Sequence, residues 1–121
     1  MMQDDFSART MDWYLACFGP VRQGDRVERV HRFLEEALEL AQAQDCTKED
    51  AHALVEYVYS RPKGDIGNEV GGVMITLAVL CEIAEVSMHK AGEEELARNW
   101  KRMDAIRAKR RDKPAGSPLP Q

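Results

Sequence analysis

Apolar side chains recur every three or four residues along much of this chain, which is the spacing of an amphipathic helix. The clearest stretch runs from about 25 to 44, with polar side chains on the opposite face. Its apolar stripe consists of Val27, Val30, Leu34, Ala37, Leu38 and Ala41. The pattern predicts a long helix with one face buried against the rest of the fold.

The same periodicity predicts four further helices, at about 8–17, 48–59, 67–84 and 88–110. Thr47 and Ser87 stand where a side-chain oxygen can cap the start of the third and the fifth helix. The segment 67–84 is apolar on most sides, so we expect it at the centre of a bundle.

Helix following helix with short links predicts an all-α fold, a four- to five-helix bundle in one domain over residues 1–113. The length of 121 residues fits a single domain, and the aromatic content of 7% argues against an all-β fold. We expect Trp13, Phe18 and Trp100 to pack in the core. Residues 114–121 are rich in Pro, Gly and Ser and predict a flexible C-terminal tail.

Charge and cysteine usage narrow the class of protein. The net charge of −4 argues against binding a nucleic-acid polymer, although eight of the 17 basic residues fall between Arg98 and Lys113. That block is either a solvated helix face or an anion site. Three scattered cysteines indicate reduced thiols, and we expect a cytoplasmic protein. The apolar run Val70–Cys81 is shorter than the roughly 20 residues that span a bilayer, so no membrane partner is expected.

Carboxylates gather on the helix predicted at 25–44. Glu35, Glu36 and Glu39 lie on one side of it, because residues three and four apart are neighbours on a helix. Their mutual repulsion is offset if they bind a hard divalent cation. Glu69 opens the apolar helix, where a buried carboxylate without a partner would be costly. A metal site and a solvated acidic face both remain open on this evidence.

The segments 28–43 and 69–84 resemble the MazG-like, all-α nucleoside triphosphate pyrophosphatases, which carry EExxE on one helix and ExxD on a later one. The resemblance covers about residues 24 to 110. It implies hydrolysis of a nucleoside triphosphate (NTP or dNTP) to the monophosphate and pyrophosphate, with Mg²⁺ or alternatively Mn²⁺. It also implies a homodimer or a dimer of dimers, with the nucleotide site near the subunit interface.

The resemblance assigns roles to particular residues. The implied metal ligands are Glu35, Glu36, Glu39 and Glu69. Either Glu36 or Glu39 is the implied general base. The candidate phosphate-binding residues are Lys63, Arg98, Lys101 and Arg102.

One position departs from the family pattern, because Gly72 stands where the second motif has aspartate. Three accounts are open. Asp65 is an additional candidate ligand, water fills the vacant position, or the site is degenerate and binds nucleotides without cleaving them. The double glycine also resembles a phage-associated and proteobacterial subset of the family. The alternatives to an enzyme are therefore a catalytically impaired nucleotide-binding or regulatory module and a structural helical interaction protein.

Overall fold

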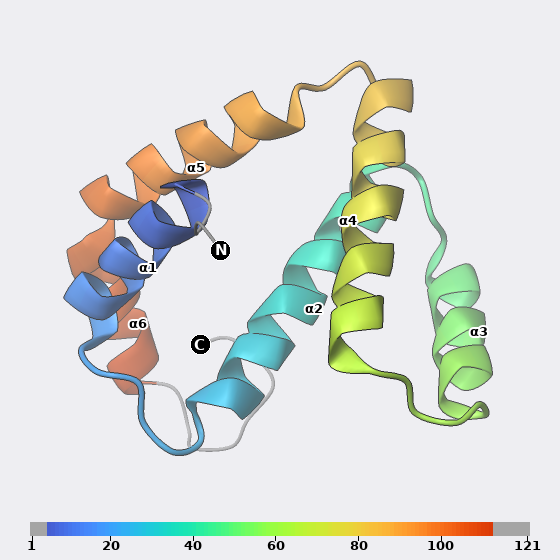
Figure 1. Cartoon of the computed structure of the whole chain (residues 1–121), viewed down its shortest axis with the longest axis horizontal. Coiled ribbons are helices and arrows are strands. Elements are labelled where there is room, and N and C mark those ends of the chain that lie inside the picture. Colours follow the sequence, from blue (N-terminus) through green and yellow to red (C-terminus); the bar gives the residue numbers. More distant parts are fainter. Residues whose placement is uncertain (1–4, 113–121) are drawn as a thin grey trace.

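The computed structural model describes residues 5–112, and within that range the chain is helical with no strands. Six helices follow one another (Figure 1): α1 (Asp5–Phe18), α2 (Asp25–Ala43), α3 (Lys48–Tyr59), α4 (Ile66–Ile83), α5 (Met88–Lys101) and α6 (Met103–Asp112). The expected all-α class is confirmed. The tail expected at 114–121 lies outside the described residues.

Side-chain caps define where three of the helices begin. The hydroxyls of Thr47 and Ser87 accept hydrogen bonds at 3.1 Å from the backbone N–H groups three residues on, as predicted for α3 and α5. Asp65 caps α4 in the same way, accepting the N–H of Asn68 at 3.1 Å. This third cap was not assigned from the sequence, and it starts α4 at Ile66.

The helix expected at 88–110 is two helices, because the chain bends at Arg102, where φ is −102° and ψ is 15°. The bend lets both halves follow α1. Leu96 of α5 is buried against α1, and Met103 and Ile106 of α6 pack on the same cluster. The periodicity gave no sign of this break, because its cause is packing against a helix distant in sequence.

The core lies where α1 meets α5 and α6. Its buried apolar residues are Trp13, Tyr14, Cys17 and Leu96, with Phe18 packed beside them. The expected core positions of Trp13 and Phe18 are confirmed. The expectation for Trp100 is wrong: its side chain is 43% exposed, at the edge of the α1–α5 contact beside Arg9 and Asp12.

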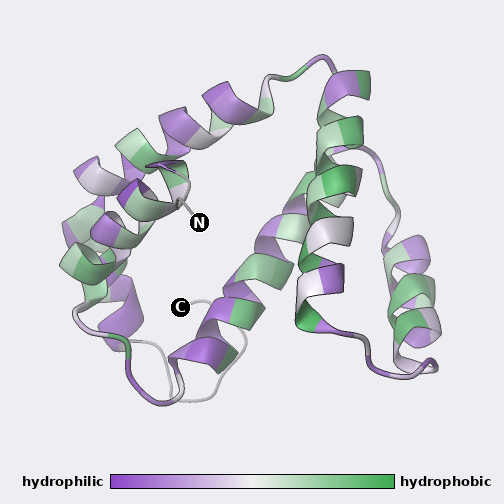
Figure 2. Ribbon diagram, viewed as in Figure 1, coloured by the Kyte–Doolittle hydropathy of each residue, from purple (hydrophilic) through white to green (hydrophobic). Residues whose placement is uncertain are grey.

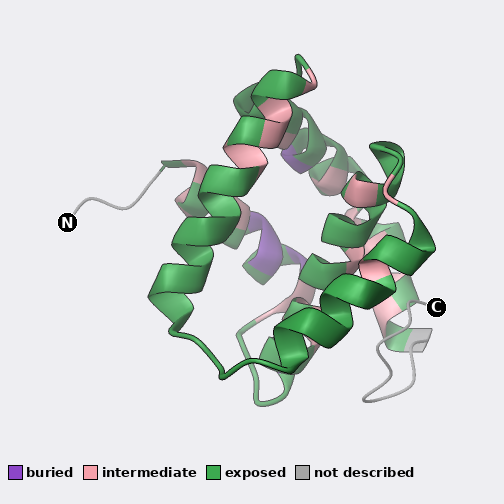
Figure 3. Cartoon of the chain, turned by 90° about the vertical axis from the view of Figure 1, so that its right-hand side faces the viewer, coloured by how far each residue is buried: buried purple, intermediate pink, exposed green. Residues whose placement is uncertain are grey.

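Helices α2, α3 and α4 extend away from this core (Figure 1) and bury no apolar residue. Figure 3 shows most of their residues as exposed. The expectation that 67–84 lies at the centre of a bundle is therefore wrong for the single chain, because no described element covers α4. By length and composition alone α4 could also cross a membrane, and it is the one such helix among the described residues.

Candidate functional site

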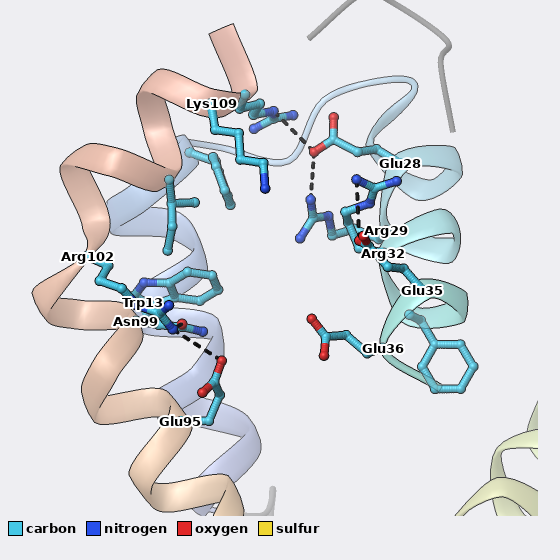
Figure 4. A pocket seen from close by; sticks show the side chains of 14 residues that line it. Trp13, Glu28, Arg29, Arg32, Glu35, Glu36, Glu95, Asn99, Arg102 and Lys109 are labelled. Carbon is cyan, nitrogen blue, oxygen red and sulfur yellow. Dashed lines mark hydrogen bonds and ion pairs between the residues drawn. The ribbon is translucent and has the colours of Figure 1, made fainter. Parts of the chain in front are cut away.

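A cavity of about 520 Å³ separates α2 from α1, α5 and α6 (Figure 4). This volume is within the range of small-molecule sites. Aromatic side chains line part of it, namely Trp13, Phe18 and Phe33. The α2 wall adds Glu28, Arg29, Arg32, Glu35 and Glu36. The opposite wall adds Glu95, Asn99, Arg102, Ile106, Lys109 and Arg110.

A cluster of ion pairs ties the start of α2 to α6. Arg110 contacts Asp25 at 2.7 Å and Glu28 at 3.4 Å, and its guanidinium lies 4.6 Å from the centre of the Phe18 ring. Asp25 also accepts the backbone N–H of Arg22 at 2.6 Å. That hydrogen bond, followed by the charge of Arg110, holds the pKa of Asp25 below its usual range, although burial acts in the opposite direction.

The arginines on the α2 wall already have acidic partners. Arg29 contacts Glu28 at 2.6 Å, and its guanidinium lies 5.4 Å from the centre of the Phe18 ring. Arg32 lies 3.6 Å from Glu35. These contacts fix both guanidinium groups beside the cavity and partly neutralise them.

On the opposite wall, Glu95 is shared by two arginines. Arg98 contacts it at 2.6 Å and Arg102 at 3.4 Å, and Arg102 also donates to Asn99 at 3.1 Å. Because these side chains are about half exposed, we expect the pairs to contribute little to stability. Their importance is that Glu95 places a carboxylate opposite α2 (Figure 4).

Two charged side chains of the cavity have no ion-pair partner among the described residues: Glu36 and Lys109. Figure 4 shows them reaching into the cavity from opposite walls, Glu36 from α2 and Lys109 from α6. Among the residues that the structure describes, the site therefore presents to any ligand that enters it one carboxylate and one ammonium group that have no ion-pair partner.

The surroundings of Glu36 raise its pKa. Partial burial of the carboxylate is the largest cause, and the charges of Glu39, Glu95 and Glu35 add to it. A carboxylate with a raised pKa is a better proton acceptor than an ordinary one, which suits a general base.

The structure brings together only some of the predicted acidic residues. Glu35 and Glu36 line the cavity, and Glu39 acts on Glu36 through its charge without lining it. Glu69 turns back over its own loop, where a Cβ added at Gly64 would collide with its carboxylate. Asp65 is engaged as the cap of α4, so neither of these two lines the cavity.

Only one of the predicted phosphate-binding residues lines the cavity. Arg102 lines the cavity, whereas Lys63, Arg98 and Lys101 do not. The cations that the sequence analysis missed are Arg29, Arg32, Lys109 and Arg110, and the missed carboxylate is Glu95. Arg29 and Arg32 could have been predicted from the sequence, because their spacing of three and four residues puts them on the same helix face as Glu36.

The fit to a metal ion is partial. Among the described residues, no group of three or more His, Cys, Asp or Glu side chains is placed to hold a metal, so the four-glutamate set is not assembled in one chain. Glu35 and Glu36 together fit a smaller role, since Mg²⁺ commonly takes one or two carboxylates and completes its shell with substrate phosphates and water.

Comparisons with protein-family models, with curated proteins and with solved structures found no match for this chain. Its functional assignment therefore depends on the residues of the cavity and on the resemblance of its acidic motif.

Proposed function

We propose that this protein is a cytoplasmic, Mg²⁺-dependent nucleoside triphosphate pyrophosphohydrolase that converts an NTP or dNTP to the monophosphate and pyrophosphate. The observation that supports this most is the pair of opposite charges, Glu36 and Lys109, which lie on opposite walls of one cavity without an ion-pair partner among the described residues. A triphosphate that arrives with Mg²⁺ presents both matching charges, because the metal favours carboxylates and the phosphates favour cations.

In this proposal the two walls of the cavity bind different parts of the substrate complex. Glu35 and Glu36 would hold the Mg²⁺ that accompanies the triphosphate. Lys109 and Arg102 hold phosphate oxygens from the opposite wall. Phe33, a cavity-lining residue that is 54% exposed, offers a ring on which a nucleobase can stack.

Glu36 accepts the proton of the attacking water in the proposed reaction. The water oxygen bonds to the α-phosphorus, and the bond between that phosphorus and the oxygen that bridges it to the β-phosphorus breaks. The products are the nucleoside monophosphate and pyrophosphate. The cations on the α5 and α6 side stabilise the charge that develops on the leaving pyrophosphate. Mg²⁺, when bound, neutralises part of the phosphate charge.

Pyrophosphate release from a panel of ribo- and deoxyribonucleoside triphosphates tests this function. The assay compares Mg²⁺, Mn²⁺ and a chelator, with wild type, Glu36→Ala and the control Glu94→Ala, an exposed carboxylate of α5 outside the cavity. We expect metal-dependent release that disappears in Glu36→Ala and persists in Glu94→Ala. Equal release by wild type and Glu36→Ala would show that the site is assigned wrongly.

A nucleotide-binding module without catalysis is the second candidate function. Gly72 in place of the family's aspartate and the absence of a three-carboxylate group among the described residues favour it. A Cβ at position 72 would meet no atom within 4 Å beyond its chain neighbours and the backbone of its own helix, so the position has room for a side chain. If Gly72→Asp gains metal affinity and turnover over an inactive wild type, the module account is supported. No gain in metal binding would count against it.

A further inference from the structure

Hydrophilic residues gather where the start of α2 lies beside the end of α6 (Figure 2). The cations Arg29 of α2 and Lys109 and Arg110 of α6 line this end of the cavity. The carboxylate of Glu28 lines it as well, and Figure 4 shows it beside Arg29, facing the wall that carries Lys109. This basic end of the cavity therefore contains an anion that belongs to the protein itself.

A single oxygen of Glu28 joins the two walls. Its Oε1 accepts a hydrogen bond from Nη2 of Arg29 at 2.6 Å and lies 3.4 Å from Nε of Arg110. The side chains of Glu28 and Arg110 are 20% and 18% exposed, so dissolved ions screen these charges weakly. Glu28 therefore occupies the point where guanidinium groups from both walls converge.

The two guanidinium groups are held by more than Glu28. That of Arg110 lies 4.6 Å from the centre of the Phe18 ring and also pairs with Asp25 at 2.7 Å. That of Arg29 lies 5.4 Å from the centre of the same ring. Such contacts with an aromatic ring orient a guanidinium without neutralising it. Both groups therefore remain aimed at one point when the Glu28 carboxylate moves away.

A carboxylate satisfies this end of the cavity only in part. The buried Nε–H of Arg29 has no hydrogen-bond partner among the described residues, and Lys109 has no ion-pair partner among them. A phosphate group carries more negative charge than a carboxylate and offers three acceptor oxygens, which match the forked donors of arginine. It therefore suits the position of Glu28 better than Glu28 does.

We propose that Glu28 is an internal competitor of the ligand: in the free protein its carboxylate holds the position between Arg29 and Arg110 that the pyrophosphate group of the ligand takes. This inference rests on the proposed function, because that function supplies a ligand with such a group, first within the triphosphate and then as the released product. Displaced Glu28 stays on α2 as a like charge beside the bound anion. It therefore weakens the binding of substrate and product alike, and it favours release of the product.

Glu28 has a simpler alternative role, as a strut that keeps the two arginines in place. The two roles predict changes of opposite sign. Removing the charge of a competitor strengthens anion binding, whereas removing a strut weakens it, because the arginines lose their orientation. The sign of the change in affinity therefore decides between them.

Calorimetric titration of Glu28→Gln, which keeps the size of the side chain and removes its charge, is the test. The probes are inorganic pyrophosphate in a chelator and, with Mg²⁺, a nucleoside triphosphate with a methylene group at the α–β bridge. We expect the Kd of both to fall about tenfold relative to wild type, the order of effect of one like charge beside an anion. Glu94→Gln, the same substitution at an exposed carboxylate of α5 outside the cavity, should leave both values unchanged.

Arg29→Gln tests whether the effect arises at this position. It should weaken pyrophosphate binding, and Glu28→Gln should gain less affinity in its presence than in wild type, because competitor and ligand share Arg29. An equal gain in both backgrounds would overturn the proposal, as would unchanged or weaker binding to Glu28→Gln. A gain for only one of the two probes would contradict a shared position.

A crystal structure of the wild type with pyrophosphate gives a readout that does not depend on any variant. The pyrophosphate should lie against Arg29 and Arg110, with the Glu28 carboxylate turned away from both. Pyrophosphate bound elsewhere, with both Glu28 contacts intact, would refute the competitor.

The measurements distinguish failure of the proposed enzyme from failure of the competitor. A wild type without turnover, whose Glu28→Gln variant nevertheless binds pyrophosphate more tightly, would refute the enzyme and keep the competitor. Turnover by the wild type, with unchanged pyrophosphate affinity in Glu28→Gln, would refute the competitor and keep the enzyme.

Discussion

Glu36 and Glu39 are one turn apart on α2, yet their surroundings differ. Glu36 lines the cavity and its pKa is raised by partial burial and by three neighbouring carboxylates. Glu39 does not line the cavity and is one of the charges that raise the pKa of Glu36. Either residue fitted the role of base from the sequence, and the surroundings now favour Glu36.

Replacing Glu36 with glutamine should lower kcat by a factor of about 10²–10⁴, the usual contribution of a general base. Glu39→Gln should have a smaller effect, since it removes a charge but not the proton acceptor. Steady-state kinetics from pH 5 to 9 checks both variants, and the acidic limb of the wild-type profile should vanish in Glu36→Gln. If Glu39→Gln were the more damaging change, Glu39 would be the base.

The raised pKa of Glu36 also predicts a dependence of stability on pH. The folded state binds this proton more tightly than the unfolded state, whose value is about 4.3. The resulting stabilisation is complete below that value and is lost as the pH rises through the folded pKa. Glu36→Gln should therefore be at least as stable as wild type at pH 7. Thermal melts at pH 4 and pH 7 test this, and a less stable variant at pH 7 would contradict it.

Lys109 and Lys101 provide a test residue and a matched control for the proposed phosphate site. Lys109 lines the cavity without a described ion-pair partner, and Lys101 is exposed outside it. Lys109→Met should raise the KM for the nucleotide about tenfold to a hundredfold, the range for a lost hydrogen bond to a charged group. Lys101→Met should leave KM unchanged. If Lys101→Met raised the KM more than Lys109→Met, the phosphates would bind nearer to Lys101 on α5.

At the level of helices, periodicity and capping predicted the all-α class and the approximate positions of most helices, but not how the helices pack. The caps at Thr47 and Ser87 were readable because they depend on neighbours in sequence. The bend at Arg102 and the cavity wall from α5 and α6 were not, because both arise from packing between distant segments. For the same reason, Glu36 was predicted as a site residue and Glu95, which faces it, was missed.

The stability that the ion pair between α2 and α6 contributes should fall at low pH. The pKa of Asp25 is lowered, so its contribution to stability is present above the unfolded value of about 3.9 and is lost as the pH falls through the folded pKa. Between pH 7 and pH 3 the melting temperature of wild type should fall more than that of Asp25→Asn. Arg110→Gln should reduce the same difference, because it removes the ion-pair partner. Equal pH dependence in all three proteins would contradict this link.

For the whole molecule, the described residues divide into a packed core of α1, α5 and α6 and an uncovered set of helices, α2 to α4. The cavity lies between the two parts. A ligand that contacts both walls therefore joins two parts that few other contacts connect. Ligand binding should be visible in the stability of the entire protein, whether or not the ligand is cleaved.

This gives a test that separates nucleotide-binding functions from a purely structural role. A nucleoside triphosphate with a methylene group at the α–β bridge resists pyrophosphate release but keeps the phosphate charges. With Mg²⁺ and the analogue at one hundred times its Kd, the free energy of unfolding should rise by about 2.7 kcal/mol. Neither Mg²⁺ alone nor the analogue with a chelator should reach that value, because each supplies only part of the charge that Glu36 and Lys109 match. Thermal or urea unfolding measures the shift, with Lys109→Met as the variant that should lose most of it. If neither nucleotide nor metal changed the free energy of unfolding, the protein would be a helical interaction protein with a solvated acidic face.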